Sequence, residues 1–456
     1  MISAPSHPGT PAWAIDDRHS TALAAMVWVL VVLMIVPEGL DYAGLAGAGA
    51  PSAAGAVSRA LWLALLGTSA LVIAWRAGLA WLLAGTLNPF LLILVALALA
   101  SMAWSIDASL SARRLARMVT IVGTGIAFVL MAWHARRLQE VVRPVLTLML
   151  LGSLVFGLLY PALAIHQEVA AELQGAWRGL ANHKNGLGAL ACFGVIFWCH
   201  GWLSGEVRTP SALFGIGVSA ACLVLSRSST SMAATVFVVL FIAVALRGPL
   251  ALRRWLPTGV VLLTVLLLLY ALAILGLIPG LGTMLASLAG LTGKDTTLTG
   301  RTEIWWILAE HIELRPFFGS GYAAYWTAGP MLGTESHEFV RRMQGFYPGS
   351  AHNGYLEIVN DLGWVGLAGL LGYAVMHVRQ SLQLLRPERS QAVLYLALFF
   401  QQAITNLSES HWFSVLSVDF VIMTLASTAL ARSLLEHRLR GAFGDPVPQA
   451  WRAGTA

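Results

Sequence analysis

The sequence predicts an all-α, polytopic membrane protein with about twelve transmembrane helices. Of its 456 residues, 57% are hydrophobic and only 11% are charged, whereas a soluble domain carries about 25% charged residues. The mean hydropathy is +0.74. Apolar stretches of about 20 residues, the length that crosses a bilayer, recur along the chain. We therefore expect a single membrane domain over residues 1–456 and exclude a soluble enzyme.

The predicted spans are bounded by Arg, Pro, Gly or acidic residues. The first is expected to be a retained helix and not a cleaved signal peptide, because a polar stretch with Asp16, Asp17 and Arg18 precedes it. The predicted spans are 20–36, 57–75, 89–104, 118–133, 144–160, 186–202, 211–226, 231–246, 257–277, 363–378, 391–405 and 413–434.

The basic residues favour a topology with both chain ends inside. Short inner segments such as 247–255 and 379–389 are rich in arginine, as the positive-inside rule requires. A large minority of the 28 basic residues nevertheless falls outside, which an anionic ligand on the outer side would explain. The one long segment between spans, 278–362, is also expected outside, and a segment of that length is usually functional.

Segment 278–362 contains two helical patterns of its own. The sequence "GRTEIWWILAEHIELRP" predicts an amphipathic helix that ends before Pro316. The sequence "GSAHNGYLEIVNDLG" predicts a second helix, with Ser350 as its N-cap and with Gly363 near the entry to the next span. The apolar face of the first helix consists of Ile304, Ile307, Leu308 and Ile312.

Several enzyme classes have no support in the sequence. It has no P-loop, no dinucleotide-binding glycine pattern, no H-E-x-x-H, no D-x-D and no G-x-S-x-G. The three cysteines, Cys192, Cys199 and Cys222, lie within apolar runs without ligand spacing, so they predict neither a disulfide framework nor a metal site.

Polar clusters with arginine lie at the predicted outer ends of the spans. Arg227 in "LSRSSTS" is close to the hydrocarbon, where an arginine is costly unless it meets an anion or a carboxylate. Arg301 lies near the N-terminus of a predicted loop helix, whose dipole also attracts negative charge. Two further clusters are expected to bind phosphate or, alternatively, to serve as interfacial anchors and helix caps. They are Arg113, Arg114 and Arg117, and Arg178, His183, Lys184 and Asn185.

His352 is the candidate general base. The pattern places it in the first turn of a helix, where the dipole keeps the imidazole neutral and able to accept a proton. His311, His337 and His411 compete for this role. Asp419, predicted within a span, is expected either to pair with an arginine or to couple to protons.

Six motifs follow one another along the chain: "SMAWSIDASLSARR" (101–114), "ANHKNGLG" (181–188), "SRSS" (226–229), "LTGRTEIW" (298–305), "GSGYAAYW" (319–326) and "SAHNGYLEIVNDLGWVGL" (350–367). In this order they resemble the O-antigen ligase and polymerase superfamily, and the resemblance covers nearly the whole membrane region. Each motif alone is weak, and their common order is what makes the resemblance specific.

The resemblance implies an inverting, metal-independent glycosyltransferase of the bacterial inner membrane, with its active site on the periplasmic face and with 278–362 as a periplasmic catalytic loop. The donor it implies is a glycan on undecaprenyl diphosphate, and in the ligase branch the acceptor is the lipid A core oligosaccharide. No cofactor and no nucleic acid are expected. By motif and order, the resemblance assigns the catalytic roles to Arg227, Arg301 and His352. The residues expected to bind substrate are Arg178, Lys184, Asn185, Arg113, Arg114, Asn353 and Tyr355.

The ligase branch is favoured, but two alternatives remain. An O-antigen or exopolysaccharide polymerase uses the same donor with a lipid-linked glycan as acceptor. A lipid-linked oligosaccharide flippase would use the outer arginines to line a transit path, but it predicts inverted repeats and discontinuous spans that the sequence does not display. Shared motifs do not separate acceptors, and His337 leaves the identity of the base open.

Overall fold

The all-α prediction is confirmed by a computed structural model, which describes residues 20–37, 55–167, 173–277, 301–326, 339, 341–343 and 347–443. Within these ranges the chain is helical, and an isolated bridge between Ile165 and Trp177 is its one β contact. The helices are α1 Ser20–Ile35, α3 Gly55–Trp75, α4 Ala77–Ala84, α5 Pro89–Ala100, α6 Ala108–Leu130, α7 Arg137–Leu159, α8 Pro161–Ala164, α9 Lys184–Leu203, α10 Thr209–Leu225, α11 Ser229–Arg247, α12 Leu250–Arg254, α13 Leu256–Ile274, α15 Arg301–Leu314, α17 Gly354–Leu384, α18 Arg389–Thr405 and α19 Val418–Phe443.

All of the predicted spans fall on helices. Within the described ranges, seven helices are long and apolar enough to cross a membrane, or eight if one bent pair counts as a span. Two further apolar helices, α1 and α10, are shorter. The chain is thus a multi-pass membrane protein, and the number twelve stays a prediction.

The bent pair was not predicted from the sequence. Helix α4 follows α3 almost directly, and α4 and the helical stretch from Pro89 to Ala103 are bent by 105° relative to each other. The break ends at Asn88, whose side chain accepts a hydrogen bond from the backbone N–H of Phe90, while Pro89 occupies the first helical position. This local capping chemistry starts α5 in a new direction.

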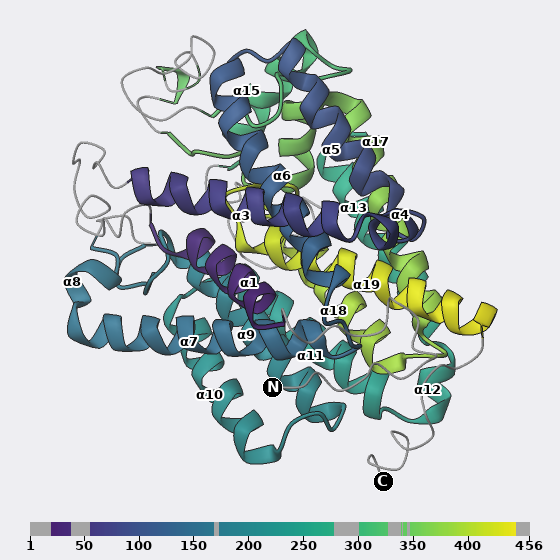
Figure 1. Ribbon diagram of the computed structural model, residues 1–456. Helices are drawn as coiled ribbons and strands as arrows, with labels where there is room; N and C mark the ends of the chain where they lie inside the picture. Colours follow the sequence, from purple (N-terminus) through teal and green to yellow (C-terminus); the bar gives the residue numbers. More distant parts are fainter. Residues whose placement is uncertain are drawn as a thin grey trace.

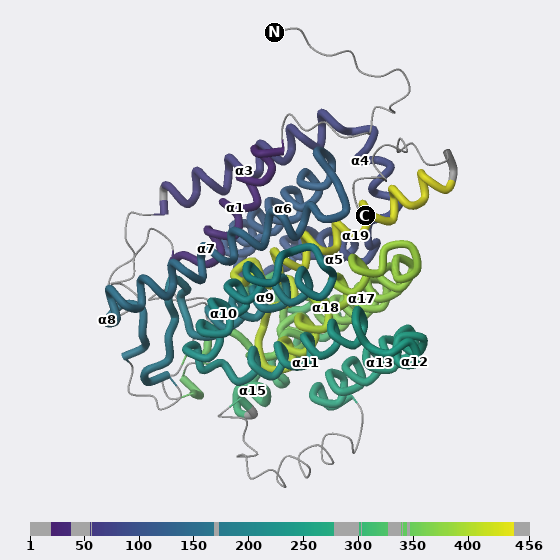
Figure 2. Tube along the Cα trace, turned by 90° about the horizontal axis from the view of Figure 1, so that it is seen from below, coloured from purple at the N-terminus to yellow at the C-terminus, as the bar shows by residue number. Residues whose placement is uncertain are grey.

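The helices α9, α18 and α19 form the centre of the bundle (Figure 1). The apolar stretch of α19 is buried along its whole length, whereas only 22% of the corresponding stretch is buried in α3 and in α13. Figure 2 shows α3 and α13 on opposite sides of the bundle, with α9 and α18 between them.

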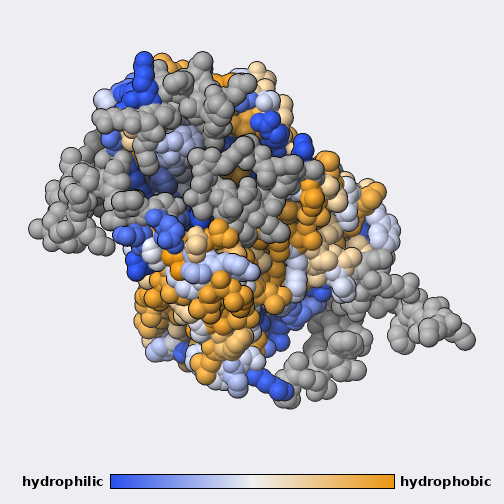
Figure 3. Space-filling view, turned by 90° about the vertical axis from the view of Figure 1, so that its left-hand side faces the viewer, coloured by the Kyte–Doolittle hydropathy of each residue, from blue (hydrophilic) through white to orange (hydrophobic). Residues whose placement is uncertain are grey.

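The outer surface of the bundle is apolar, as contact with lipid requires. Figure 3 shows apolar side chains over much of the helical body, with hydrophilic side chains gathered near its edges. Large apolar side chains on the peripheral helices are exposed, among them Leu63, Leu71, Phe214, Val236, Leu240, Leu262 and Leu266.

Helix α17 is broken at Gly363, and this break attaches the segment after α15 to the bundle. Gly363 has φ +66°, and a Cβ there would lie 2.2 Å from the carbonyl carbon of Phe317. The backbone N–H groups of Trp364 and Val365 donate to the carbonyls of Pro316 and Phe317, at 2.9 and 3.2 Å. The break lies where the sequence placed the entry to the next span, and these carbonyls satisfy the N–H groups that it frees.

Candidate functional site

A cavity of about 1200 Å³ lies among α6, α9, α11, α15, α17 and the α18–α19 connection. It collects residues from distant parts of the sequence, and the predicted helix face of α15 (Ile304, Ile307, Leu308, Ile312) is buried beside it, as expected. The predicted site residues that line the cavity are Arg114, Lys184, Asn185, Arg227, Arg301 and His352.

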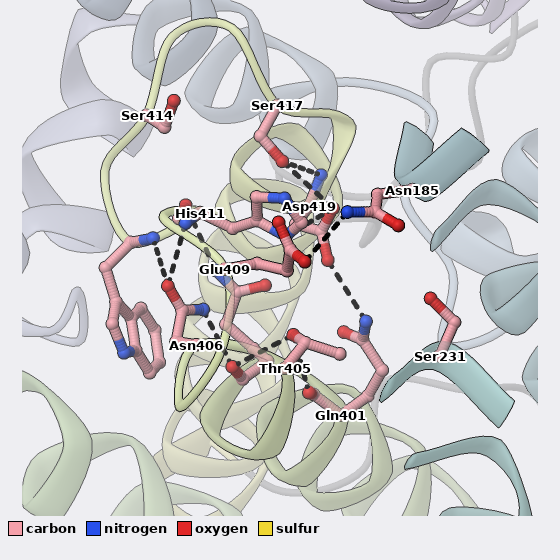
Figure 4. Close-up of polar contacts among 12 residues, drawn as sticks. Asn185, Ser231, Gln401, Thr405, Asn406, Glu409, His411, Ser414, Ser417 and Asp419 are labelled. Carbon is pink, nitrogen blue, oxygen red and sulfur yellow. Dashed lines mark hydrogen bonds and ion pairs between the residues drawn. The ribbon is translucent and has the colours of Figure 1, made fainter. Parts of the chain in front are cut away.

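Glu409, in the α18–α19 connection, links several of these residues. Its Oε1 lies 3.4 Å from Nη2 of Arg301 and accepts a hydrogen bond from the Asn185 amide at 2.8 Å. Its Oε2 lies 3.6 Å from Nδ1 of His352. Figure 4 shows the Glu409 carboxylate facing Asn185, with His411 and Asp419 beside it.

The residues around Glu409 stabilise its ionised form. Burial acts to raise the pKa of this carboxyl, but its interaction with the nearby His352 and the charges of His411 and Arg301 outweigh burial and bring the pKa below its usual value. Glu409 is therefore ionised at neutral pH. A carboxylate beside Nδ1 favours the His352 tautomer with N–H at Nδ1 and a free lone pair at Nε2, the form that accepts a proton.

Arg227 and Arg301 reach the cavity from different elements. Arg301 is the first residue of α15, as predicted, and is partly buried. Arg227 lies in the connection between α10 and α11, is exposed, and donates from Nη1 to the carbonyl of Gln174 at 2.9 Å. Both guanidinium groups can meet an anion in a planar, bidentate manner.

Backbone strain gathers around this cavity. Five non-glycine residues of the described chain have positive φ, and four of them line the cavity. Such a conformation costs about 1–2 kcal/mol per residue and persists where the surroundings impose it, often at functional sites. The four are Arg227 (φ +51°), Ala323 (+50°), His352 (+48°) and Phe413 (+53°).

The expected position of His352 in the first turn of a helix is wrong. The N-cap of α17 is Asn353, whose side chain accepts from the N–H groups of Tyr355 and Leu356, so His352 precedes the helix. Ser350, the predicted N-cap, accepts instead from the N–H of His352 at 3.3 Å. An asparagine forms a cap as readily as a serine, which explains the shift of three residues. The carboxylate of Glu409 thus replaces the helix dipole as the group that orients the imidazole.

Four predicted substrate-binding residues do not line the cavity. Arg178 is buried and donates from Nε to the carbonyl of Leu163 at 2.8 Å. Asn353 is the buried N-cap, and the buried Tyr355 hydroxyl donates to the carbonyl of Ala403. Arg113 is exposed on α6. The first three therefore have structural partners in place of a ligand.

Asp419 is also placed differently from the prediction. It lies in the first turn of α19 instead of the middle of a span, and the partner that the structure shows for its Oδ2 is Nδ1 of His411, at 3.2 Å, and not the predicted arginine. Gln401 and Ser417 donate to the same carboxylate at 3.0 and 2.9 Å. Burial acts to lower the pKa of His411, but the carboxylates of Asp419 and Glu409 outweigh burial and raise the pKa above its usual value.

Sequence reasoning missed Glu409. It is a lone acidic residue in the short polar stretch "SESH", and no motif or periodicity marks it. The competing histidine His337 lies outside the described residues. Among the described residues, no cluster of three or more His, Cys, Asp or Glu side chains is arranged to hold a metal ion. Metal independence stays a prediction.

The fold and the cavity define a class of protein: a multi-pass membrane protein in which arginines, a lysine and a carboxylate-paired histidine line one large cavity. Residues 214–371 match the family model described as O-Antigen ligase. The chain is also 32% identical over 234 residues to the exopolysaccharide production protein ExoQ of Rhizobium meliloti (strain 1021).

Over the matched regions the chain is therefore similar to the O-antigen ligase and polymerase superfamily, whose members are membrane glycosyltransferase-like enzymes. The match with the Rhizobium protein covers 48% of this chain and 48% of that protein. The chain thus spans about half the length of this curated relative.

Proposed function

We propose that the chain is an O-antigen ligase: an inner-membrane glycosyltransferase that moves a glycan from undecaprenyl diphosphate to a sugar of the lipid A core on the periplasmic face. The observation that carries the proposal is the convergence of Arg227, Arg301 and a His352–Glu409 pair on one cavity. Inverting transfer from a diphosphate needs cations at the leaving group and a base at the acceptor hydroxyl.

The proposed reaction is a single displacement. The acceptor oxygen attacks the anomeric carbon while its proton passes to Nε2 of His352, and a new glycosidic C–O bond forms. The bond between the anomeric carbon and the phosphate oxygen breaks, and its electron pair leaves with the diphosphate. Arg227 and Arg301 stabilise the negative charge that develops on that oxygen.

A polymerase is the second candidate function. It would use the same donor and the same residues, with another lipid-linked glycan as acceptor. The similarity to a protein of exopolysaccharide production favours it, while the family description favours the ligase. The proposed roles of Arg227, Arg301 and His352 are common to both.

The test is reconstitution of the full chain in vesicles. Undecaprenyl-diphosphate-linked glycan is added with core-bearing lipid A or alone, and products are separated by size. Transfer to lipid A, with no growth of the donor alone, supports the ligase, whereas growth of the donor alone supports the polymerase. Transfer should persist in EDTA. Movement of the donor across the vesicle membrane without transfer would contradict both functions in favour of a flippase.

A further inference from the structure

A second polar cluster lines the same cavity, and the proposed reaction leaves it without a role. It consists of Glu357 and Asp361, one turn apart on α17, with the aromatic side chains of Tyr322, Trp326 and Tyr347 and the guanidinium of Arg114. These residues differ from the partners of Glu409, which are Arg301, His352 and Asn185.

The frame of this cluster is rigid. Arg114 donates to the carbonyls of Ala323 and Trp326, at 2.6 and 3.2 Å, and Asp361 Oδ2 accepts from the N–H of Ala323 at 2.9 Å. The rings of Trp326 and Tyr347 contact each other edge to face, with centroids 6.1 Å apart. The side chains are therefore held in place before any ligand arrives.

Two buried polar atoms in this cluster lack a hydrogen bond of good geometry to any described residue: Asp361 Oδ1, an acceptor, and Trp326 Nε1, a donor. Asp361 is 4% exposed and Trp326 3% exposed, and both line the cavity. Buried polar groups are normally satisfied, so a ligand hydroxyl suits Asp361 Oδ1, while Trp326 Nε1 lies close enough to the Glu357 carboxyl to interact with it.

The chemistry of the cluster suits a sugar ring. The carboxyl groups of Glu357 and Asp361 can accept hydrogen bonds from hydroxyl groups, and an indole N–H can donate to a hydroxyl oxygen. The flat aromatic faces complement the C–H faces of a pyranose. A cavity of about 1200 Å³ also exceeds the usual range of about 300–1,000 Å³ for one small ligand, so it has room for a second substrate.

The backbone connects this cluster to the proposed base. The N–H of Ala351 donates to Glu357 Oε2 at 2.6 Å, and the next residue, His352, faces Glu409. A sugar bound at Glu357 would therefore lie near His352, the proposed base, while the diphosphate would bind at the proposed arginine site.

We infer that Glu357, Asp361 and Trp326 form the binding subsite for the acceptor sugar. The inference rests on the proposed transferase function and assigns the acceptor side of the same cavity. It applies to a lipid A core sugar and to a polymer end alike, since both present hydroxyl groups on a pyranose.

The experiment measures initial transfer rates by the reconstituted full chain while the concentration of the acceptor that supports transfer is varied. Glu357→Gln and Asp361→Asn keep the side-chain volume nearly constant, and Trp326→Phe removes the indole N–H and leaves a smaller ring. Each should raise the KM for acceptor about 10–100-fold, while binding of undecaprenyl diphosphate stays within twofold of wild type. Glu310→Gln, which removes an exposed carboxylate of α15 outside the cavity, is the matched control and should change neither quantity.

The outcomes separate this inference from the proposed function. If the wild-type chain transfers glycan but Trp326→Phe, folded by thermal melting, keeps a wild-type acceptor KM, the subsite is wrong and the function stands. If the carboxylate variants weaken undecaprenyl diphosphate binding as much as acceptor binding, the subsite is also wrong. If the wild-type chain transfers nothing to any acceptor, the proposed function itself fails.

Discussion

Glu409 Oε2 lies 3.6 Å from His352 Nδ1, so a carboxylate of the α18–α19 connection faces the imidazole that precedes α17. The same carboxylate lies 3.4 Å from the guanidinium of Arg301. One side chain therefore joins the candidate base to a cation of the candidate diphosphate site. Because the two oxygens of Glu409 have different partners, both the charge and the geometry of the site depend on this residue.

Replacement of Glu409 by Gln should lower the transfer rate about 10²-fold. The amide can present an N–H to Nδ1 of His352, which favours the tautomer with a proton on Nε2 and removes the acceptor lone pair. Initial rates and binding of undecaprenyl diphosphate are measured side by side, and binding should change much less than rate. Glu303→Gln, which removes another cavity-lining carboxylate, is the control. Wild-type turnover in Glu409→Gln would remove Glu409 from the mechanism.

Arg227 and Arg301 should each be required for transfer. Their replacement by Ala removes a bidentate donor from the candidate diphosphate site, and Lys should restore little because it lacks the planar fork. Most activity should be lost in Arg227→Ala without a loss of folded protein, since that side chain is exposed. Activity is measured per folded protein, with thermal melting alongside. Normal transfer in both Ala variants would contradict the assignment.

Replacement of Arg178 should have a different effect from replacement of Arg227 or Arg301. Arg178 was predicted to bind substrate, but it is buried and donates to the carbonyl of Leu163. Arg178→Ala should destabilise the fold by about 1–3 kcal/mol, the effect of leaving a buried acceptor unsatisfied. The turnover of the remaining folded protein should stay close to wild type. A loss of turnover with unchanged melting would instead return Arg178 to the substrate site.

His352 is expected to be the base, and His337, outside the described residues, is the alternative. His352→Ala should bind undecaprenyl diphosphate normally and transfer about 10²–10⁴-fold more slowly. His337→Ala is measured in the same assays. If only His337→Ala shows slow transfer with normal binding, the roles are reversed. If His352→Ala fails to bind the diphosphate, the histidine is a phosphate ligand.

Local patterns predicted the elements and part of the site. Helical spacing correctly predicted the buried face of α15, which consists of Ile304, Ile307, Leu308 and Ile312. The order of the motifs singled out Arg301, and this residue lines the cavity. These features depend on helical periodicity and on chain segments that keep their own conformation.

Features that depend on packing between distant segments could not be predicted in this way. Glu409 gains its position because Asn406 Oδ1 accepts the N–H groups of His411 and Trp412, which shapes the α18–α19 connection. The inward turn of Arg178 depends on a carbonyl fifteen residues earlier in the chain. A single charged residue in a loop is part of no periodic pattern, so the sequence does not indicate which distant residue it contacts.

The His411–Asp419 pair should make stability depend on pH on the alkaline side. The pKa of His411 is raised in the folded protein, so its charged form adds stability below the ordinary value of 6.5, and this stability is lost as pH rises through the folded value. Tm of wild type and of His411→Gln is measured from pH 6 to pH 9. The gap between them should narrow with rising pH, by about 2–4 °C per kcal/mol lost. A gap that widens over this range would contradict the raised pKa.

Gly354 should tolerate no side chain, because the start of α17 packs directly on the connection that carries Glu409. Its N–H donates to the carbonyl of Asn406 at 2.9 Å, and a Cβ there would lie 1.8 Å from Asn406 Oδ1. Asn406 is fully buried, so Gly354→Ala must displace it, at about 1–3 kcal/mol of stability, and transfer should fall with the displaced Glu409. Gly217→Ala in α10, where nothing lies within 4 Å, is the control and should be neutral or stabilising by up to about 1 kcal/mol. Both variants are compared by thermal melting and transfer rate, and equal behaviour of the two would show that the α17 contact does not position the connection.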